Sequence, residues 1–171
     1  ILLYMCMTLF CLIMVWHGFL SCRKKIFTEA SATFQDAISK EMNTRLGSIP
    51  IKTNRGTFLL SDSISYDEKE RWCDQYYLSL NDPNRIFLDS LFRARLADLG
   101  MKTQTAVRCK RKEKTTISYT DSLFMKKATA LKPVIYRKNK NIEDNIELQA
   151  FVQIPLSFIL KRADSILLFL L

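Results

Sequence analysis

The first 22 residues, ILLYMCMTLFCLIMVWHGFLSC, contain no aspartate, glutamate, lysine or arginine, and charge begins abruptly with RKK at 23–25. An α-helix rises about 1.5 Å per residue, so roughly 20 apolar residues reach across the ~30 Å hydrocarbon core of a bilayer. A cleaved signal peptide has a shorter apolar stretch and an A-x-A-like cleavage site. A buried core helix usually carries some polar positions. We therefore predict a transmembrane helix over 1–22, with Trp16 and His17 in the interfacial belt.

The other end of the chain is also apolar: it closes on ILLFLL, residues 166–171. Six exposed apolar residues at a true C-terminus would favour aggregation, whereas the start of a second membrane helix is expected to be apolar. The chain also begins without an initiator Met. We expect a fragment with a transmembrane helix (1–22), a folded domain (23–155), and a membrane-proximal segment with the truncated start of a second transmembrane helix (156–171). RKK favours a cytoplasmic domain by the positive-inside rule, but with one flank missing the orientation stays open.

A helical stalk is predicted directly after the membrane segment, over 23–47. Asp36 with Lys40 and Glu41 with Arg45 are acid-first i,i+4 pairs on the expected polar face, and Gly47 is placed to end the helix. The apolar positions recur every three or four residues and form one stripe: Phe27, Ala30, Phe34, Ile38, Met42 and Leu46.

Two further elements precede the strands. TNRG between IPI and TFLL, within 49–65, predicts a short hairpin. NDPNRIFLDSLFRARLADLG, residues 81–100, predicts an amphipathic helix with Asp82 as N-cap, Pro83 at its first position and Gly100 at its end. The apolar positions of this helix lie mostly on one side: Ile86, Leu88, Leu91, Phe92, Leu96 and Leu99.

After Gly100 the apolar period changes to two. Residues 103–120 predict a hairpin that turns at KRKEK, PVIYRKN predicts a third strand, and NIELQAFVQIP a fourth. Such alternation is typical of an antiparallel sheet with one wet face. The predicted class is α+β, with helices on one face of the sheet. After Pro155, KRADS is expected to interrupt the apolar PLSFIL before the final apolar run.

The residue inventory excludes several kinds of chemistry. The only histidine is His17, so the polar domain lacks a histidine base and most metal sites. No phosphate-binding loop, nucleophile elbow or C-x-x-C motif occurs. We assign no catalytic residue, metal or cofactor. In an extracytoplasmic domain Cys73 and Cys109 are candidates for a disulfide, and two buried thiols are the alternative.

Basic residues are concentrated in one segment. Residues 102–140 hold 12 lysines and arginines against two acids, so this segment carries the net charge of +9 of the whole chain. Nucleic-acid binding is one interpretation, but no helix-turn-helix or aromatic RNA-binding signature accompanies these residues. A face near anionic lipid headgroups, or a pocket for an anionic ligand, fits equally. We do not expect nucleic acid as a partner.

The layout resembles a known group of proteins. FTEASATFQDAISKEMNTR after the first apolar run, LDSLFRARLADLG before the strands and IELQAFVQIP before the second apolar run resemble the periplasmic input region of Bacteroidetes-type membrane sensors. These are two-component sensor histidine kinases and membrane-anchored winged-helix transcriptional regulators. The resemblance implies a PAS-like sensor fold, a place in the periplasm at the bacterial inner membrane, and an output domain beyond Leu171.

The chain is therefore expected to be the extracytoplasmic sensing region of a signal-transduction protein, with no enzymatic activity of its own. Its expected partners are the lipid bilayer and an unknown small-molecule or protein signal, and a homodimer is compatible with this layout. Arg108, Tyr119 and Tyr136 are the candidate pocket residues, because they are polar-tipped or charged residues on the predicted sheet. A membrane-anchored envelope enzyme and a structural or adhesion module are the alternatives.

Overall fold

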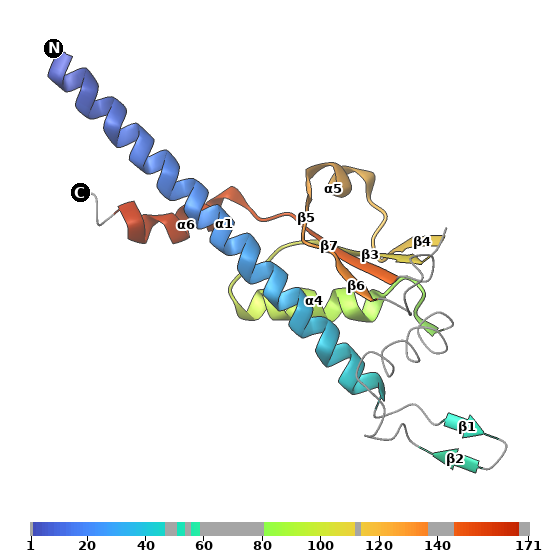
Figure 1. Cartoon of the computed structure of the whole chain (residues 1–171). Helices are drawn as coiled ribbons and strands as arrows, with labels where there is room; N and C mark the ends of the chain where they lie inside the picture. The colour runs from blue at the N-terminus through green and yellow to red at the C-terminus, as the bar shows by residue number, and fades with distance from the viewer. Residues whose placement is uncertain are drawn as a thin grey trace.

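A single long helix dominates the fold. The computed structural model describes residues 2–46, 51–53, 56–58, 81–111, 114–136 and 146–167. Helix α1 (Leu2–Leu46) runs without a break from the apolar segment into the folded part of the chain (Figure 1). It is long and apolar enough to cross a membrane, and its most apolar window is not covered by the rest of the protein. This exposure favours membrane association, because such a surface is unfavourable in water.

The second half of α1 is part of the hydrophobic core. Ala30, Phe34, Ile38 and Met42 are buried, as the apolar stripe predicts. Ile26 rather than Phe27 continues the stripe toward the membrane segment, and Phe27 packs at the edge of the core. The Phe34 ring meets Phe92 of the next helix edge-on, with 5.2 Å between ring centroids. Such contacts hold the long helix against the domain along several turns.

The α+β prediction is correct: an antiparallel sheet packs against helices. Its strands are β3 (Thr105–Arg111), β4 (Lys114–Ile117), β5 (Thr129–Ala130), β6 (Val134–Tyr136) and β7 (Ile146–Val152). The order is β4-β3-β7-β5, and β6 also pairs with β7. The predicted hairpin is β3–β4, whereas β7 crosses back to pair with β3 along its full length, from Thr105 opposite Val152 to Arg111 opposite Ile146.

The two faces of the sheet are covered differently. Val107, Leu148 and Ala150 point into the main core with α1 and α4 (Ile86–Asp98). The opposite face was expected to be wet, but helix α5 (Ser122–Lys127) covers one end of it. There a second apolar cluster forms around three buried residues: Ala106, Phe124 and Phe151. Helices therefore lie on both faces, because this end of the outer face is apolar.

Helix α4 ends as predicted but begins later than predicted. Gly100 takes a φ of +79°, and the amide of Met101 donates to the Leu96 carbonyl at 2.8 Å, so the glycine turns the chain out of the helix. Asp82 caps the other end by accepting from the amides of Ile86 and Phe87. Pro83 is not the first helical residue, because Arg85 at φ 56° places a turn before Ile86.

Two smaller elements complete the described chain. The predicted hairpin is present as β1 (Ile51–Thr53) and β2 (Gly56–Phe58), which pair antiparallel. Helix α6 (Leu156–Leu167) begins directly after Pro155, as expected. Residues 161–165 do not interrupt it, because Ala163 is buried and continues the apolar face from Ile159. Gly47 lies outside the described residues.

Candidate functional site

Arg108 lies on the outer face of the sheet, where its side chain contacts neighbouring residues of β7. Its guanidinium donates to the side-chain oxygen of Gln149 and lies 3.6 Å from a carboxylate oxygen of Glu147. The same group stacks over the Phe151 ring, 5.4 Å from the ring centroid. These contacts across adjacent strands are the pairs that stabilise a sheet. They place Arg108 beside the second apolar cluster, in a structural role.

The two tyrosines do not join Arg108 in one site. Tyr119 packs edge-on against Phe124, with 5.5 Å between ring centroids, and its hydroxyl donates to Asp121 at 3.5 Å. It therefore helps to hold α5 on the sheet. The backbone of Tyr136 pairs with Ile146 in the β6–β7 ladder, and its side chain lies outside what the structure describes. Cys109 is buried in β3, while Cys73, its candidate disulfide partner, also lies outside the described residues.

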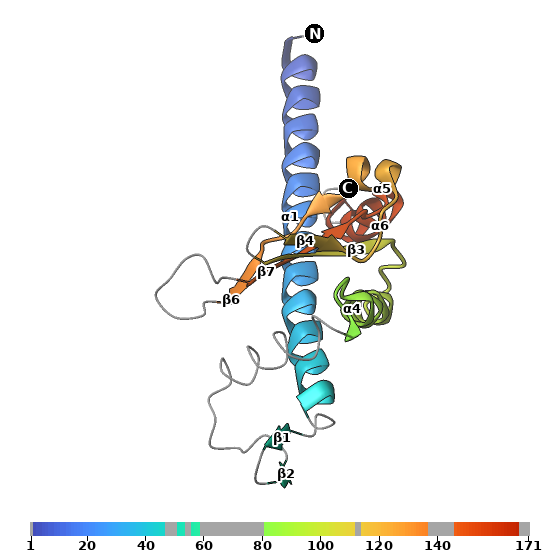
Figure 2. The same cartoon turned by 90° about the vertical axis from the view of Figure 1, so that its right-hand side faces the viewer.

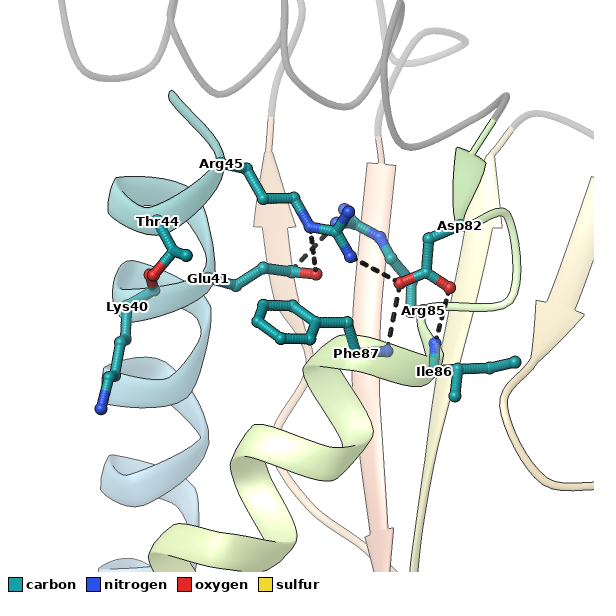
Figure 3. A network of polar contacts seen from close by, with 8 residues as sticks. All are labelled: Lys40, Glu41, Thr44, Arg45, Asp82, Arg85, Ile86 and Phe87. Atoms are coloured by element: carbon teal, nitrogen blue, oxygen red, sulfur yellow. Dashed lines mark hydrogen bonds and ion pairs between the residues drawn. The ribbon is translucent and has the colours of Figure 1, made fainter. Parts of the chain in front are cut away.

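A buried polar network at the far end of α1 is the most tightly connected charged group described. Figure 3 shows it between the last turn of α1 and the first turn of α4. The guanidinium of Arg85 donates to a carboxylate oxygen of Glu41 at 3.1 Å. Glu41 is 2% exposed and Arg85 is 4% exposed. Both charges are therefore removed from water, where a buried ion is costly unless opposite charges and hydrogen bonds compensate it.

Arg45 and Asp82 connect this ion pair to the last turn of α1 and to the start of α4. Arg45 lies 3.4 Å from Glu41, one turn earlier on α1, and 2.8 Å from a carboxylate oxygen of Asp82. Asp82 is also the cap of α4, so one carboxylate binds both α1 and α4 (Figure 3). The Arg45 guanidinium stacks over the Phe87 ring, 4.7 Å from its centroid. We call Glu41, Arg45, Asp82 and Arg85 the distal network.

Glu41 was expected on a solvated face and is instead buried. The sequence held a signal for this: Glu41 follows Phe34 by seven residues and Ala37 by four, so it continues the apolar stripe. Arg85 adopts a positive φ and its side chain contacts Glu41 of α1, which no local pattern indicated. The expected partner of Asp36 was Lys40; in the structure Asp36 pairs with Arg95 of α4 at 3.4 Å.

A second buried carboxylate links α4 to the sheet. Asp89 accepts from the hydroxyl of Thr105 on β3 and from Arg93, whose nitrogen lies at 3.0 Å. Burial raises the pKa of Asp89 above its ordinary value, although hydrogen bonds from Thr105 and the charge of Arg93 act in the opposite direction. Arg93 itself is half exposed, so it compensates the buried carboxylate only in part.

Within the described residues, two buried polar contacts connect elements of the fold to one another. Within the described ranges, no three histidine, cysteine or acidic side chains gather in a way that suits a metal ion. The distal network joins α1 to α4, and Asp89 joins α4 to β3. The distal network therefore connects the folded part of the chain to α1, which also carries the apolar segment.

Comparison with protein-family models, with curated proteins and with solved structures gave no match to this chain. Function is therefore inferred from the residues of this chain alone.

Proposed function

We propose that this chain is the extracytoplasmic signal-sensing region of a membrane-bound signal-transduction protein. The continuity of α1 carries the proposal: one helix supplies both the apolar segment and the central helix of the folded domain. A rigid helix moves as a unit, so a rearrangement of the core displaces the apolar segment as well. A domain that serves only as an anchored enzyme or adhesion module has no need of this rigid connection.

The proposal includes a second membrane helix that starts with the apolar run 166–171, at the end of α6, and a cytoplasmic output domain, either a histidine kinase or a winged-helix regulator. It is supported by the position of α6, which packs on α1 through Ile159 and Ala163 near the end of the apolar segment. Two membrane helices that leave the domain side by side can change their relative position when the domain changes state. The signal is a population shift between two packed states.

The folded domain lies in the periplasm of a bacterium with its apolar helix in the inner membrane, and its sheet belongs to a PAS-like fold. The signal is a small molecule or a protein partner, and we assign no reaction to the chain. Arg108 and Tyr119 were the candidate pocket residues, and both are occupied by structural contacts. We therefore propose no ligand pocket there and place the candidate transmission site at the distal network.

The coding sequence beyond residue 171 tests the proposal directly. We expect it to continue into a second apolar helix, followed by a phospho-accepting helix with an ATP-binding domain, or by a winged helix. A stop codon directly after Leu171, or a downstream region without an apolar helix, would overturn the proposal.

The output of the full-length protein tests transmission. Glu41→Gln removes the buried negative charge that lies 3.1 Å from Arg85 and 3.4 Å from Arg45, so we expect it to shift basal autophosphorylation or target-gene transcription. Asp36→Asn is the matched control, because it removes a carboxylate from an exposed pair on the same helix. Equal outputs of both variants and the parent, at equal membrane abundance, would contradict transmission through the distal network.

A labelling experiment tests the orientation. Lys126 is exposed on α5, so a Lys126→Cys variant in an otherwise cysteine-free chain presents one accessible thiol. We expect a membrane-impermeant maleimide to label it in intact cells whose outer membrane has been made permeable. Labelling only after the inner membrane is broken would place the domain in the cytoplasm.

A further inference from the structure

Helix α6 has one apolar face that is buried and another that is exposed. Ile159 and Ala163, one turn apart, are buried against α1. Leu156 and Leu160, also one turn apart, are 60% and 45% exposed. A soluble surface helix usually places polar residues where these two leucines lie. The outer face of α6 is therefore apolar without a partner among the described residues.

Specific contacts fix α6 beside the end of the apolar segment of α1. The thiol of Cys22, the last residue of that segment, lies 3.8 Å from the Ile159 carbonyl oxygen. Arg162 pairs with Glu29, almost two turns further along α1. Figure 1 and Figure 2 both place α6 on the side of the sheet from which the apolar part of α1 emerges. Helix α6 therefore lies beside the end of a helix segment whose surface is itself apolar and exposed.

Basic side chains lie close to the place where α6 meets the end of the apolar segment of α1. Arg23, Lys24 and Lys25 are exposed on α1 directly after the apolar segment, and Lys161 is exposed on α6 beside Leu160. Basic side chains at the end of a membrane helix meet the phosphate groups of lipids, and an adjacent apolar face enters the boundary of the acyl chains. Lipid phosphate therefore complements both properties of this surface.

We propose that α6 is an interfacial helix that binds the surface of an anionic bilayer. Leu156 and Leu160 face the acyl-chain boundary, and Lys161 with the basic run at 23–25 binds lipid phosphates. The bilayer is the favoured occupant because α6 packs on α1 at the end of its exposed apolar segment, where Cys22 meets Ile159. This inference requires α1 to cross the membrane but does not depend on signal sensing, so the two proposals can fail separately.

Depth-dependent quenching of a single tryptophan tests the position of α6. The two native tryptophans are first replaced by Trp16→Phe and Trp72→Phe, and Leu160→Trp is then introduced into the full chain in nanodiscs. We expect phospholipids brominated on the upper acyl chain to quench this tryptophan. Ile86→Trp is the matched control, because Ile86 is equally an exposed apolar residue (59%) but lies beside the distal network (Figure 3).

Quenching at both positions, or at neither, would overturn the proposal. Quenching that appears only when two chains share a nanodisc would assign the surface to a second copy and would also overturn it. Circular dichroism of each variant shows whether the fold is retained, and both substitutions are at exposed positions that a larger side chain can occupy.

Charge reversal tests the preference for anionic lipid. One lysine near an anionic membrane surface contributes about fivefold to binding, so Lys161→Glu should weaken quenching of the tryptophan at 160 in discs that contain phosphatidylglycerol. Lys114→Glu, at an exposed position on β4, should leave it unchanged. Added salt should reduce the difference between the two variants by screening. Equal quenching in phosphatidylcholine and phosphatidylglycerol discs would contradict the electrostatic part of the proposal.

Discussion

Glu41 and Arg85 are opposite charges that are both almost fully buried and lie 3.1 Å apart. Removing one partner of a buried ion pair typically costs about 3–5 kcal/mol. We expect Glu41→Gln to lower the free energy of unfolding by about this amount. The measurement is denaturant unfolding of the full chain in nanodiscs, followed by circular dichroism.

The exposed pair Asp36–Arg95 supplies the control for that measurement. Asp36 is 60% exposed and its carboxylate lies 3.4 Å from Arg95. Surface pairs of this kind contribute about 0–1 kcal/mol, so Asp36→Asn should be nearly neutral. If Glu41→Gln were as mild as Asp36→Asn, the distal network would not stabilise the junction of α1 and α4.

Asp89 gives the fold a pH dependence with a defined sign. Its pKa is raised in the folded state, so between the unfolded value near 3.8 and the folded value the folded chain holds a proton that the unfolded chain has lost. The contribution of Asp89 to stability is therefore greatest at and below the unfolded pKa and falls as the pH rises through the folded pKa.

Asp89→Asn removes this dependence and keeps an oxygen that accepts from Thr105. We expect the stability of the parent, measured relative to the variant, to increase on acidification through the folded pKa of Asp89. Thermal unfolding at a series of pH values, with both chains in the same nanodiscs, checks this. A constant difference between the two chains across that range would show that the pKa is not raised.

At the scale of elements, Gly100 sets where α4 stops. Its φ of +79° is strained for any residue with a Cβ, while among the described residues a Cβ built there meets the Phe158 ring at 4.0 Å and nothing closer. The cost of Gly100→Ala is therefore one of backbone conformation, about 1 kcal/mol. Gly100→Asn should recover part of the loss, because asparagine adopts the left-handed region more readily. Denaturant midpoints rank the three chains, and equal midpoints would be inconsistent with a strained cap.

The sequence predicted elements well where a single periodic pattern decided the structure. The alternation in 146–154 predicts β7, and TNRG predicts the β1–β2 hairpin, because local side-chain pattern and turn chemistry determine both. The predicted start of α4 was wrong because Arg85 adopts a positive φ just before the helix. Contacts of Arg85 with α1 stabilise this conformation. Helix α5 was missed because its six residues are too few to show a helical period.

The site was less predictable than the fold, for a physical reason. Glu41 and Arg85 are 44 positions apart, and a contact at that separation leaves no pattern within either segment. Arg108, Tyr119 and Tyr136 were chosen as polar residues on a sheet, a property that does not separate a pocket from ordinary cross-strand pairs. The burial of Glu41 was the one feature that the helical stripe could have indicated.

At the scale of the whole molecule, the exposed apolar half of α1 favours association with a membrane. A charged residue at the centre of a membrane helix costs about 2.5–3.5 kcal/mol on insertion scales. Leu9→Arg combined with Ile13→Arg should therefore move the chain out of the carbonate-resistant membrane fraction, in which the parent remains. Leu123→Arg is the control, because Leu123 is equally exposed (62%) but lies on α5 in the folded domain. If all three chains resisted extraction alike, α6 and the basic residues would suffice for attachment; if the parent itself were extracted, α1 would not be a membrane helix.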